Sequence, residues 1–273
     1  MWYTLKMKYE LLVTDFDDTL IRDNRTIGPD VLDSIKLLID RGGKFAICTG
    51  RMFRSIRKEA LRAGLEGTII CYQGALISDL TSGETLHHTP MPVVNAVKIA
   101  RILEECGIYF QIYIDDTLTV AKRTEYTEAY EKICDVTAKI TGIPLSEYII
   151  GTDKPVTKMI AMGDPEKMQK YITEFGGKYP EFLFNCSKPY FMEIIDKKAS
   201  KGEALRWLCK YLGTDIAKCA AVGDSLNDLP MIEAAGLGIA VANAMPVLKE
   251  KADIITVSNN DGAIKKIIEE YFL

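Results

Sequence analysis

The sequence predicts an α/β fold, in which a doubly wound parallel-sheet (Rossmann-like) core domain is interrupted by an inserted α+β cap domain. Strand-like and helix-like runs alternate over residues 1–80, the pattern changes over residues 81–187, and the alternation returns over residues 188–273. Alternating runs of this kind form βαβ units, whose right-handed crossovers give a parallel sheet. The chain of 273 residues is also longer than the roughly 100–200 residues of a typical domain.

The first segment reads as strand, helix, strand, helix, strand. ELLVTDF is a compact apolar run suited to a strand that is buried on both faces. GPDVLDSIKLLIDRGG has apolar residues at helical spacing, with Pro29 suited to the first turn and Gly42 to the C-terminal end. KFAICTG predicts the second strand, RMFRSIRKEALRAGL the second helix, and GTIICYQGALI a third strand that turns at Gly74.

The middle segment mixes short strands with amphipathic helices, as an α+β module does. Its runs are the helix PVVNAVKIARILEECG, the strands IYFQIYI and TLTVAK, a helix after Thr124, the strand VTKMIAM and a helix from Asp164. The parallel rhythm is expected to return with the strand YFMEIID. The helix SKGEALRWLCKYLG, the strand CAAVGD, the helix NDLPMIEAAG, the strands LGIAVA and ADIIT, and a last helix follow it.

Composition narrows the classes of partner. The net charge of -4 and the pI of about 5.4 give no basic footprint for a nucleic-acid backbone. The first residues contain no apolar core of a signal peptide, and no stretch approaches the length of a membrane span, so we expect a cytoplasmic protein. Met7 is a plausible alternative start. Seven scattered cysteines without a Cys-x-x-Cys pair argue against a zinc or redox site. The oligomeric state stays open.

Four short motifs lie at the ends of predicted core strands or at a helix start: DFDDT, TGR, SKGEAL and GDSLNDLPM. In an open α/β sheet, ligands bind beyond the carboxyl ends of the strands. We therefore expect Asp15, Asp17, Thr49 and Asp224 to converge on one pocket, although they lie far apart in the sequence.

Convergent carboxylates repel one another unless a cation lies among them, and Mg²⁺ suits a few carboxylates together with a substrate phosphate. The alternative is that Asp17 and Asp18 only cap a turn, which is less favoured because GDSLND adds a second acidic motif. Lys201 and Thr49 would offer a positive charge and a hydrogen-bond donor to a phosphoryl group. A lysine at a helix N-terminus is unfavourable by itself, which favours a nearby anion.

In this order and at these spacings, DFDDTL, TGR, SKG and GDSLND resemble the haloacid dehalogenase (HAD) superfamily. The long insertion between the second and third motifs resembles its Cof-type phosphatase branch. The resemblance implies that Asp15 is the nucleophile that forms an aspartyl-phosphate and that Asp17 is the general acid and base. It further implies two sets of ligands. The phosphoryl oxygens would be held by Thr49, Lys201, Asn227 and the backbone amides of Phe16 and Gly50, and Mg²⁺ by Asp15, Asp224 and the carbonyl of Asp17. Asp228 would orient Lys201 or a water.

Contacts to the leaving group are expected from Arg51, Gln73 and Lys158. Members of the family often carry Asn-Gly-Ala where this chain has QGA, so Gln73 would reach with a longer side chain. Lys158 lies inside a strand-like run and must emerge on one face of it. The alternative for Lys158 is a solvent-facing position on an edge strand.

These observations predict a Mg²⁺-dependent phosphatase that hydrolyses a small phosphorylated metabolite, with a sugar phosphate as one candidate. A phosphomutase of the same fold is an alternative that the sequence does not separate. A receiver-like module phosphorylated on aspartate is a third hypothesis. It is disfavoured because a receiver needs no second acidic motif after its lysine, whereas GDSLND follows Lys201 here.

Overall fold

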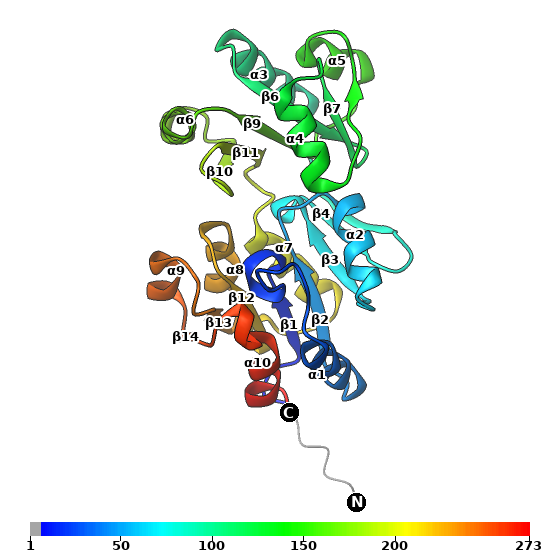
Figure 1. The fold of residues 1–273 in the computed structure, drawn as a ribbon, viewed down its shortest axis with the longest axis vertical. Coiled ribbons are helices and arrows are strands. Elements are labelled where there is room, and N and C mark those ends of the chain that lie inside the picture. The colour runs from blue at the N-terminus through cyan, green and yellow to red at the C-terminus, as the bar shows by residue number, and fades with distance from the viewer. Residues whose placement is uncertain (1–6) are drawn as a thin grey trace, which may run out of the picture.

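The computed structural model describes residues 7–273, so the six residues before the alternative start at Met7 lie outside the described residues. Two sheets organise the chain (Figure 1). The first sheet contains β1 (Leu11–Thr14), β2 (Lys44–Cys48), β3 (Thr68–Cys71), β4 (Leu76–Asp79), β5 (Thr85–His88), β12 (Cys219–Gly223), β13 (Leu237–Ala240) and β14 (Ile254–Ile255). Their order across the sheet is β14-β13-β12-β1-β2-β3-β4-β5.

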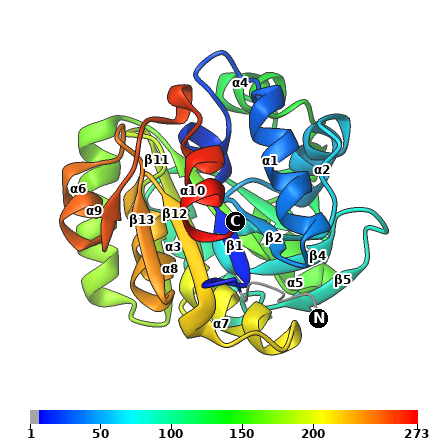
Figure 2. The ribbon, with the colours of Figure 1, turned by 90° about the horizontal axis from the view of Figure 1, so that it is seen from below.

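The six strands from β14 to β3 pair in parallel, and β4 and β5 add an antiparallel edge. Helices cover both faces (Figure 2). On one face lie α1 (Pro29–Asp40), α2 (Phe53–Arg62) and α10 (Ala263–Tyr271), and on the other lie α7 (Lys201–Tyr211) and α8 (Leu229–Ala234). The short helix α9 (Pro246–Lys251) connects β13 to β14. The expected doubly wound α/β fold is confirmed.

The second sheet is mainly antiparallel, with the order β10-β11-β9-β6-β7-β8. Its strands are β6 (Tyr109–Ile114), β7 (Thr117–Val120), β8 (Lys139–Ile140), β9 (Lys158–Met162), β10 (Phe182–Asn185) and β11 (Phe191–Asp196). Its helices are α3 (Val93–Glu105), α4 (Glu125–Cys134), α5 (Leu145–Thr152) and α6 (Pro165–Lys178). The second sheet and its helices lie above the first sheet in Figure 1.

The two faces of the second sheet have different partners. Met159 and Ala161 of β9 pack in a hydrophobic cluster with side chains of α3, α5 and α6. Ile160 and Met162, which alternate with them, belong instead to the cluster of the first sheet. Because successive side chains of a strand point to opposite faces, this face of the sheet is turned toward the first domain. Lys158 lies two residues before Ile160, so its side chain points to the same face of the sheet, toward the first domain.

Two expectations about the insertion are wrong at the level of the strands. YFMEIID was expected in the parallel core, but β11 pairs antiparallel with β9 and β10 in the second sheet, so that sheet extends to Asp196 and not to residue 187. At the other end, β5 still belongs to the first sheet, although we expected the insertion to begin at residue 81. An apolar strand reads alike in either sheet, because partner and direction are set by distant residues. We therefore propose residues 89–196 as the inserted segment.

Among residues 7–273, no helix is both long enough and apolar enough to cross a membrane.

Candidate active site

The turns that follow three neighbouring strands build the site. Asp15 comes directly after β1, Thr49 directly after β2, and Asp224 directly after β12. Since β1 lies between β2 and β12, the carboxyl ends of the three strands bring these residues together at one edge of the sheet. The residues after Asp15 make a short helical turn in which Asp18 has a left-handed backbone with φ of 58°.

Lys201 is the buried cation of the site, with 1% of its surface exposed. Its Nζ donates to Asp15 Oδ1 at 2.5 Å, to Asp228 Oδ1 at 2.5 Å and to the Cys48 carbonyl at 3.1 Å. Although burial opposes it, the charges of Asp15 and Asp228 raise the pKa of Lys201 well above its usual value. The two carboxylates thus offset both the burial of the ammonium group and its unfavourable place at the start of α7.

The carboxylates of the site are held under electrostatic stress. Burial raises the pKa of Asp15 well above its usual value; Lys201 opposes this shift, and Asp228 and Asp224 add to it. Burial, followed by the charge of Asp228, raises the pKa of Asp224 to about 7. Thr19 Oγ1 donates to Asp224 Oδ1 at 3.0 Å and only partly compensates. Such a cluster binds a cation because the cation removes the repulsion.

The donor set fits a hard divalent cation. One carboxylate oxygen each from Asp15, Asp224 and Asp228 lies within 4.8 Å of the others. Asp228 is already engaged, since its second oxygen accepts from the amides of Asp224 at 2.9 Å and Ser225 at 3.0 Å. Asp15 and Asp224 are therefore the carboxylates available to Mg²⁺, which prefers oxygen ligands. The side chain of Asp17 is not part of this cluster, and the expected role of Asp17 in metal binding involves its backbone carbonyl.

Arg51 holds the side chain of Asp17. Its Nε donates to Asp17 Oδ2 at 2.8 Å, a second nitrogen contacts Asp17 Oδ1, and its remaining terminal nitrogen donates to Glu59 at 2.6 Å. Its guanidinium also lies 5.1 Å from the ring centre of Phe16. Arg51 was expected to contact the leaving group, whereas the structure places its guanidinium on two carboxylates of the first domain.

Nine of the twelve expected residues line one cavity of about 250 Å³ between the two sheets. Of the expected residues, the first domain contributes Asp15, Asp17, Thr49, Gly50, Arg51, Gln73, Asp224 and Asn227 to the lining, and the second domain contributes Lys158. Lys201 and Asp228 lie behind this lining and contact it through Asp15 and Asp224. The side chain of Phe16 is fully buried beneath Arg51. The sequence-predicted residues therefore converge as expected.

Comparison with known proteins identifies the family. A model of the haloacid dehalogenase-like hydrolases matches residues 12–268. The chain belongs to this family of hydrolases. The resemblance to the HAD superfamily and its Cof-type branch is thereby confirmed, as is the expectation of an enzyme.

Relatives match over nearly the whole chain. The YxeH protein of Bacillus subtilis is 30% identical, over 97% of this chain and 99% of its own. A second protein of that organism, 5-amino-6-(5-phospho-D-ribitylamino)uracil phosphatase YwtE, is 28% identical, over 95% of this chain and 96% of its own. The crystal structure of TM0651 from Thermotoga maritima superimposes with a TM-score of 0.82 and 28% identity, covering 96% of this chain and 97% of that one.

The cavity is also lined by a buried carboxylate that the sequence analysis missed. Glu193 of β11 is buried, lies 3.1 Å from Lys158 and accepts from Ser187 Oγ at 2.6 Å. Glu193 could have been noticed in the sequence, because a carboxylate inside the apolar run FMEII is as unusual as the lysine inside VTKMIAM. The expected alternative for Lys158, a solvent-facing edge position, is wrong, since β9 lies between β11 and β6 and Lys158 is buried.

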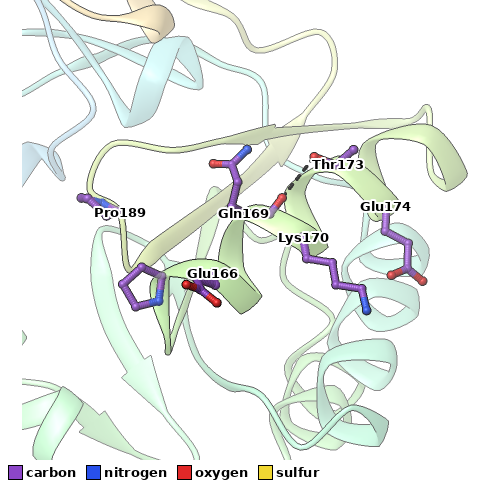
Figure 3. A pocket seen from close by; sticks show the side chains of 7 residues that line it. Glu166, Gln169, Lys170, Thr173, Glu174 and Pro189 are labelled. Carbon is purple, nitrogen blue, oxygen red and sulfur yellow. Dashed lines mark hydrogen bonds between the residues drawn. The ribbon is translucent and has the colours of Figure 1, made fainter.

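A larger hollow of about 750 Å³ lies on the surface of the second domain (Figure 3). It is formed by one side of α6 and by Pro189, and all of its lining residues are exposed. Glu166, Gln169, Lys170 and Glu174 project there from a single helix, and Pro189 is the one lining residue outside it. This hollow lacks the buried polar groups of the smaller cavity, which is the candidate active site of the hydrolase.

Proposed function

We propose that this hydrolase is a Mg²⁺-dependent phosphatase that cleaves a small phosphorylated metabolite through an aspartyl-phosphate on Asp15. The observation that carries the proposal is the joint position of two carboxyl groups in one cavity. Asp15 is fixed from behind by Lys201, while Asp17, two residues further on, is held at the cavity by Arg51. This arrangement supports attack on phosphorus by Asp15 and proton transfer by Asp17.

The first step forms a bond between a carboxylate oxygen of Asp15 and phosphorus while the bond to the leaving oxygen breaks. The carboxyl group of Asp17 donates its proton to that oxygen, so the product leaves as a neutral alcohol. In the second step Asp17 takes a proton from a water molecule, whose oxygen attacks phosphorus and releases Asp15. Thr49, Gly50 and Asn227 line the same cavity and would bind the phosphoryl oxygens, with Lys201 supplying positive charge.

Mg²⁺, when bound by Asp15, Asp224 and the carbonyl of Asp17, would offset the negative charge shared by the carboxylates and the phosphoryl group. Asp228 keeps Lys201 in place and also accepts from the Asp224 and Ser225 amides, so it links the cation side and the metal side of the site.

The cavity favours a compact substrate. Its volume of about 250 Å³ lies below the roughly 300–1,000 Å³ of common ligand pockets. Its walls on the second domain combine aromatic side chains, such as Tyr130 and Tyr190, with the charged Lys158 and Glu193. The relative YwtE is named for a phosphorylated ribityl compound, so phosphorylated sugars and sugar alcohols are the first class to test.

The division of labour between Asp15 and Asp17 provides the test. Asp15→Asn should abolish phosphate release from p-nitrophenyl phosphate and form no phosphoenzyme, because an amide does not form the acyl phosphate. Asp17→Asn should still be attacked by this substrate, whose leaving group needs little protonation, and should accumulate phosphoenzyme because water activation is slow. Acid quench followed by mass spectrometry locates the adduct. An adduct outside Asp15, or turnover by Asp15→Asn, would refute the assignment.

A further inference from the structure

A buried ion pair on the second domain faces the phosphate-binding part of the first. Lys158 Nζ of β9 lies 3.1 Å from Glu193 Oε2 of β11, and the two side chains are 3% and 5% exposed. Each partner also bonds across the interface. Lys158 Nζ donates to the Gly50 carbonyl at 2.8 Å, and Glu193 Oε2 accepts from Gln73 Nε2 at 2.8 Å. The pair therefore depends on both domains for its hydrogen bonds.

Gln73 is the second half of this arrangement. Its side-chain amide donates to Glu193 and, through Oε1, accepts from Asn227 Nδ2 at 2.9 Å. The amide lies directly over Gly50, where an added Cβ would come within 2.3 Å of Gln73 Nε2. Gln73 is 2% exposed and has a left-handed φ of 60°, a backbone conformation that a residue with a side chain adopts only when its surroundings impose it.

The bonds form a continuous path that crosses twice between the domains: from Asn227 to Gln73, to Glu193, to Lys158 and to Gly50. Both ends of the path are residues to which we assign phosphoryl oxygens. A shorter asparagine at position 73 would lack the methylene that lets one amide reach both Asn227 and Glu193. If the second domain moved away, Lys158 and Glu193 would each exchange a protein partner for water. Gly50 would lose its bond to Lys158, and Gln73, which holds Asn227, would lose its bond to Glu193.

We propose that Gln73, Lys158 and Glu193 are positioning residues that fix Gly50 and Asn227 for phosphate only when the second domain lies over the first. The inference rests on the proposed function and adds to it a coupling between domain closure and phosphate affinity. Because coupling is reciprocal, bound phosphate also favours the closed arrangement. Lys158 and Gln73 thereby act on the phosphate side of the site through Gly50 and Asn227, and not only on the leaving group.

The experiment measures inorganic phosphate as an inhibitor of p-nitrophenyl phosphate hydrolysis by the full chain with Mg²⁺. Gln73→Asn and Glu193→Gln should each raise the inhibition constant of phosphate by about tenfold, with a matching rise in KM. Both substitutions break the same bond, between Gln73 and Glu193. The inhibition constant of phosphate for the double variant should therefore be close to that of the single variant with the larger effect. Multiplication of the two effects would overturn the proposal.

A second pair of substitutions protects the test against misfolding. Glu193→Gln leaves a buried lysine without its partner, whereas Lys158→Met with Glu193→Leu replaces the whole pair by apolar groups of similar size, which proteins often tolerate. This double variant should keep the melting temperature of the wild type and still lose phosphate affinity by about tenfold. A stable double variant with unchanged phosphate inhibition would overturn the coupling.

Gln111→Asn is the matched control, because Gln111 is a buried glutamine of the second sheet whose amide donates to Tyr113 at 2.7 Å and lies outside the path. It should leave the inhibition constant within about twofold of the wild type. A wild-type chain that releases no phosphate would reject the proposed function itself. A wild-type chain that does so, with all variants equally inhibited by phosphate, would reject only this inference.

Discussion

Lys201 shows how much of the site depends on one side chain, because its ammonium group holds Asp15 and Asp228 together in the interior. We expect Lys201→Ala to lower kcat by about 10²–10³-fold, since it removes a fixed charge from the developing transition state. Lys36→Ala is the control, because Lys36 is exposed and its ion pair among residues 7–273 is with Asp40 of the same helix, α1. Steady-state kinetics decide the question, and an unchanged kcat for Lys201→Ala would contradict the role of this lysine.

The stressed carboxylates predict an unusual pH dependence for the metal-free protein. The pKa of Asp224 in the folded chain is about 7, above its usual value of 3.8. At any pH between these two values, the carboxyl group therefore binds more protons in the folded chain than in the unfolded chain. The contribution of this group to stability is therefore largest at low pH and is lost as the pH rises through about 7. In EDTA, the melting temperature should fall between about pH 5 and pH 8, and Asp224→Asn should flatten the fall. An equal slope in both proteins would contradict this account.

At the residue scale the sequence predicted which side chains come together better than it predicted their individual contacts. Asp15, Asp17, Thr49 and Asp224 line one cavity, and Lys201 lies behind it against Asp15, because each follows a strand or opens a helix whose position the fold fixes. The ion pairs of Arg51 with Asp17 and Glu59 could not be predicted from the sequence. They depend on side chains that α2 and the turn after β1 bring together.

Two helical glycines, one packed against a neighbouring helix and one in open space, should respond oppositely to substitution by alanine. An added Cβ at Gly202 in α7 would lie 2.4 Å from the Pro230 carbonyl of α8, whereas one at Gly176 in α6 would meet nothing within 4 Å. Gly202→Ala should therefore lower the free energy of unfolding by about 1–3 kcal/mol and displace the neighbouring Lys201. Gly176→Ala should raise it by about 0.5–1 kcal/mol through its higher helix propensity.

Urea denaturation of the two glycine variants measures both changes, and kcat reports the displacement of Lys201. Equal stability of the two variants would mean that α7 moves away from α8 without loss of packing energy.

The sequence predicted helices well where capping residues mark their ends. It failed for strands whose sheet is decided by pairing with distant strands. α1 begins at Pro29 and ends before Gly42, which has a φ of 88°, as the sequence indicated. The helix after Thr124 begins there because the threonine side chain accepts from Thr127 N. In contrast, α5 and β10 were missed, and β11 was assigned to the wrong sheet, because its antiparallel pairing with β9 and β10 leaves no mark within FMEIID.

For the whole molecule, removal of the metal should have two separable effects. EDTA should abolish phosphate release, because the carboxylate cluster then repels the phosphoryl dianion. Excess Mg²⁺ should restore activity and raise the melting temperature, since a ligand that binds only the folded chain stabilises it by mass action. Asp224→Asn should lose most of the Mg²⁺-dependent rise. Full activity in a rigorously metal-free sample would contradict the assignment of the cluster.

The position of β1 between β2 and β12 has a consequence for synthesis. Leu11 of β1 pairs with Cys219. A ribosome must therefore translate about 200 further residues, which takes about 10–40 s, before the apolar strand that precedes Asp15 has its second neighbour. The inserted segment is contiguous and can fold during that interval, while one edge of β1 waits. A nascent chain that stops before Asp224 lacks two of the three clustered carboxylates, Asp224 and Asp228. We therefore expect activity only near the end of translation. Until then β1 has an unpaired apolar edge, which is a risk for aggregation.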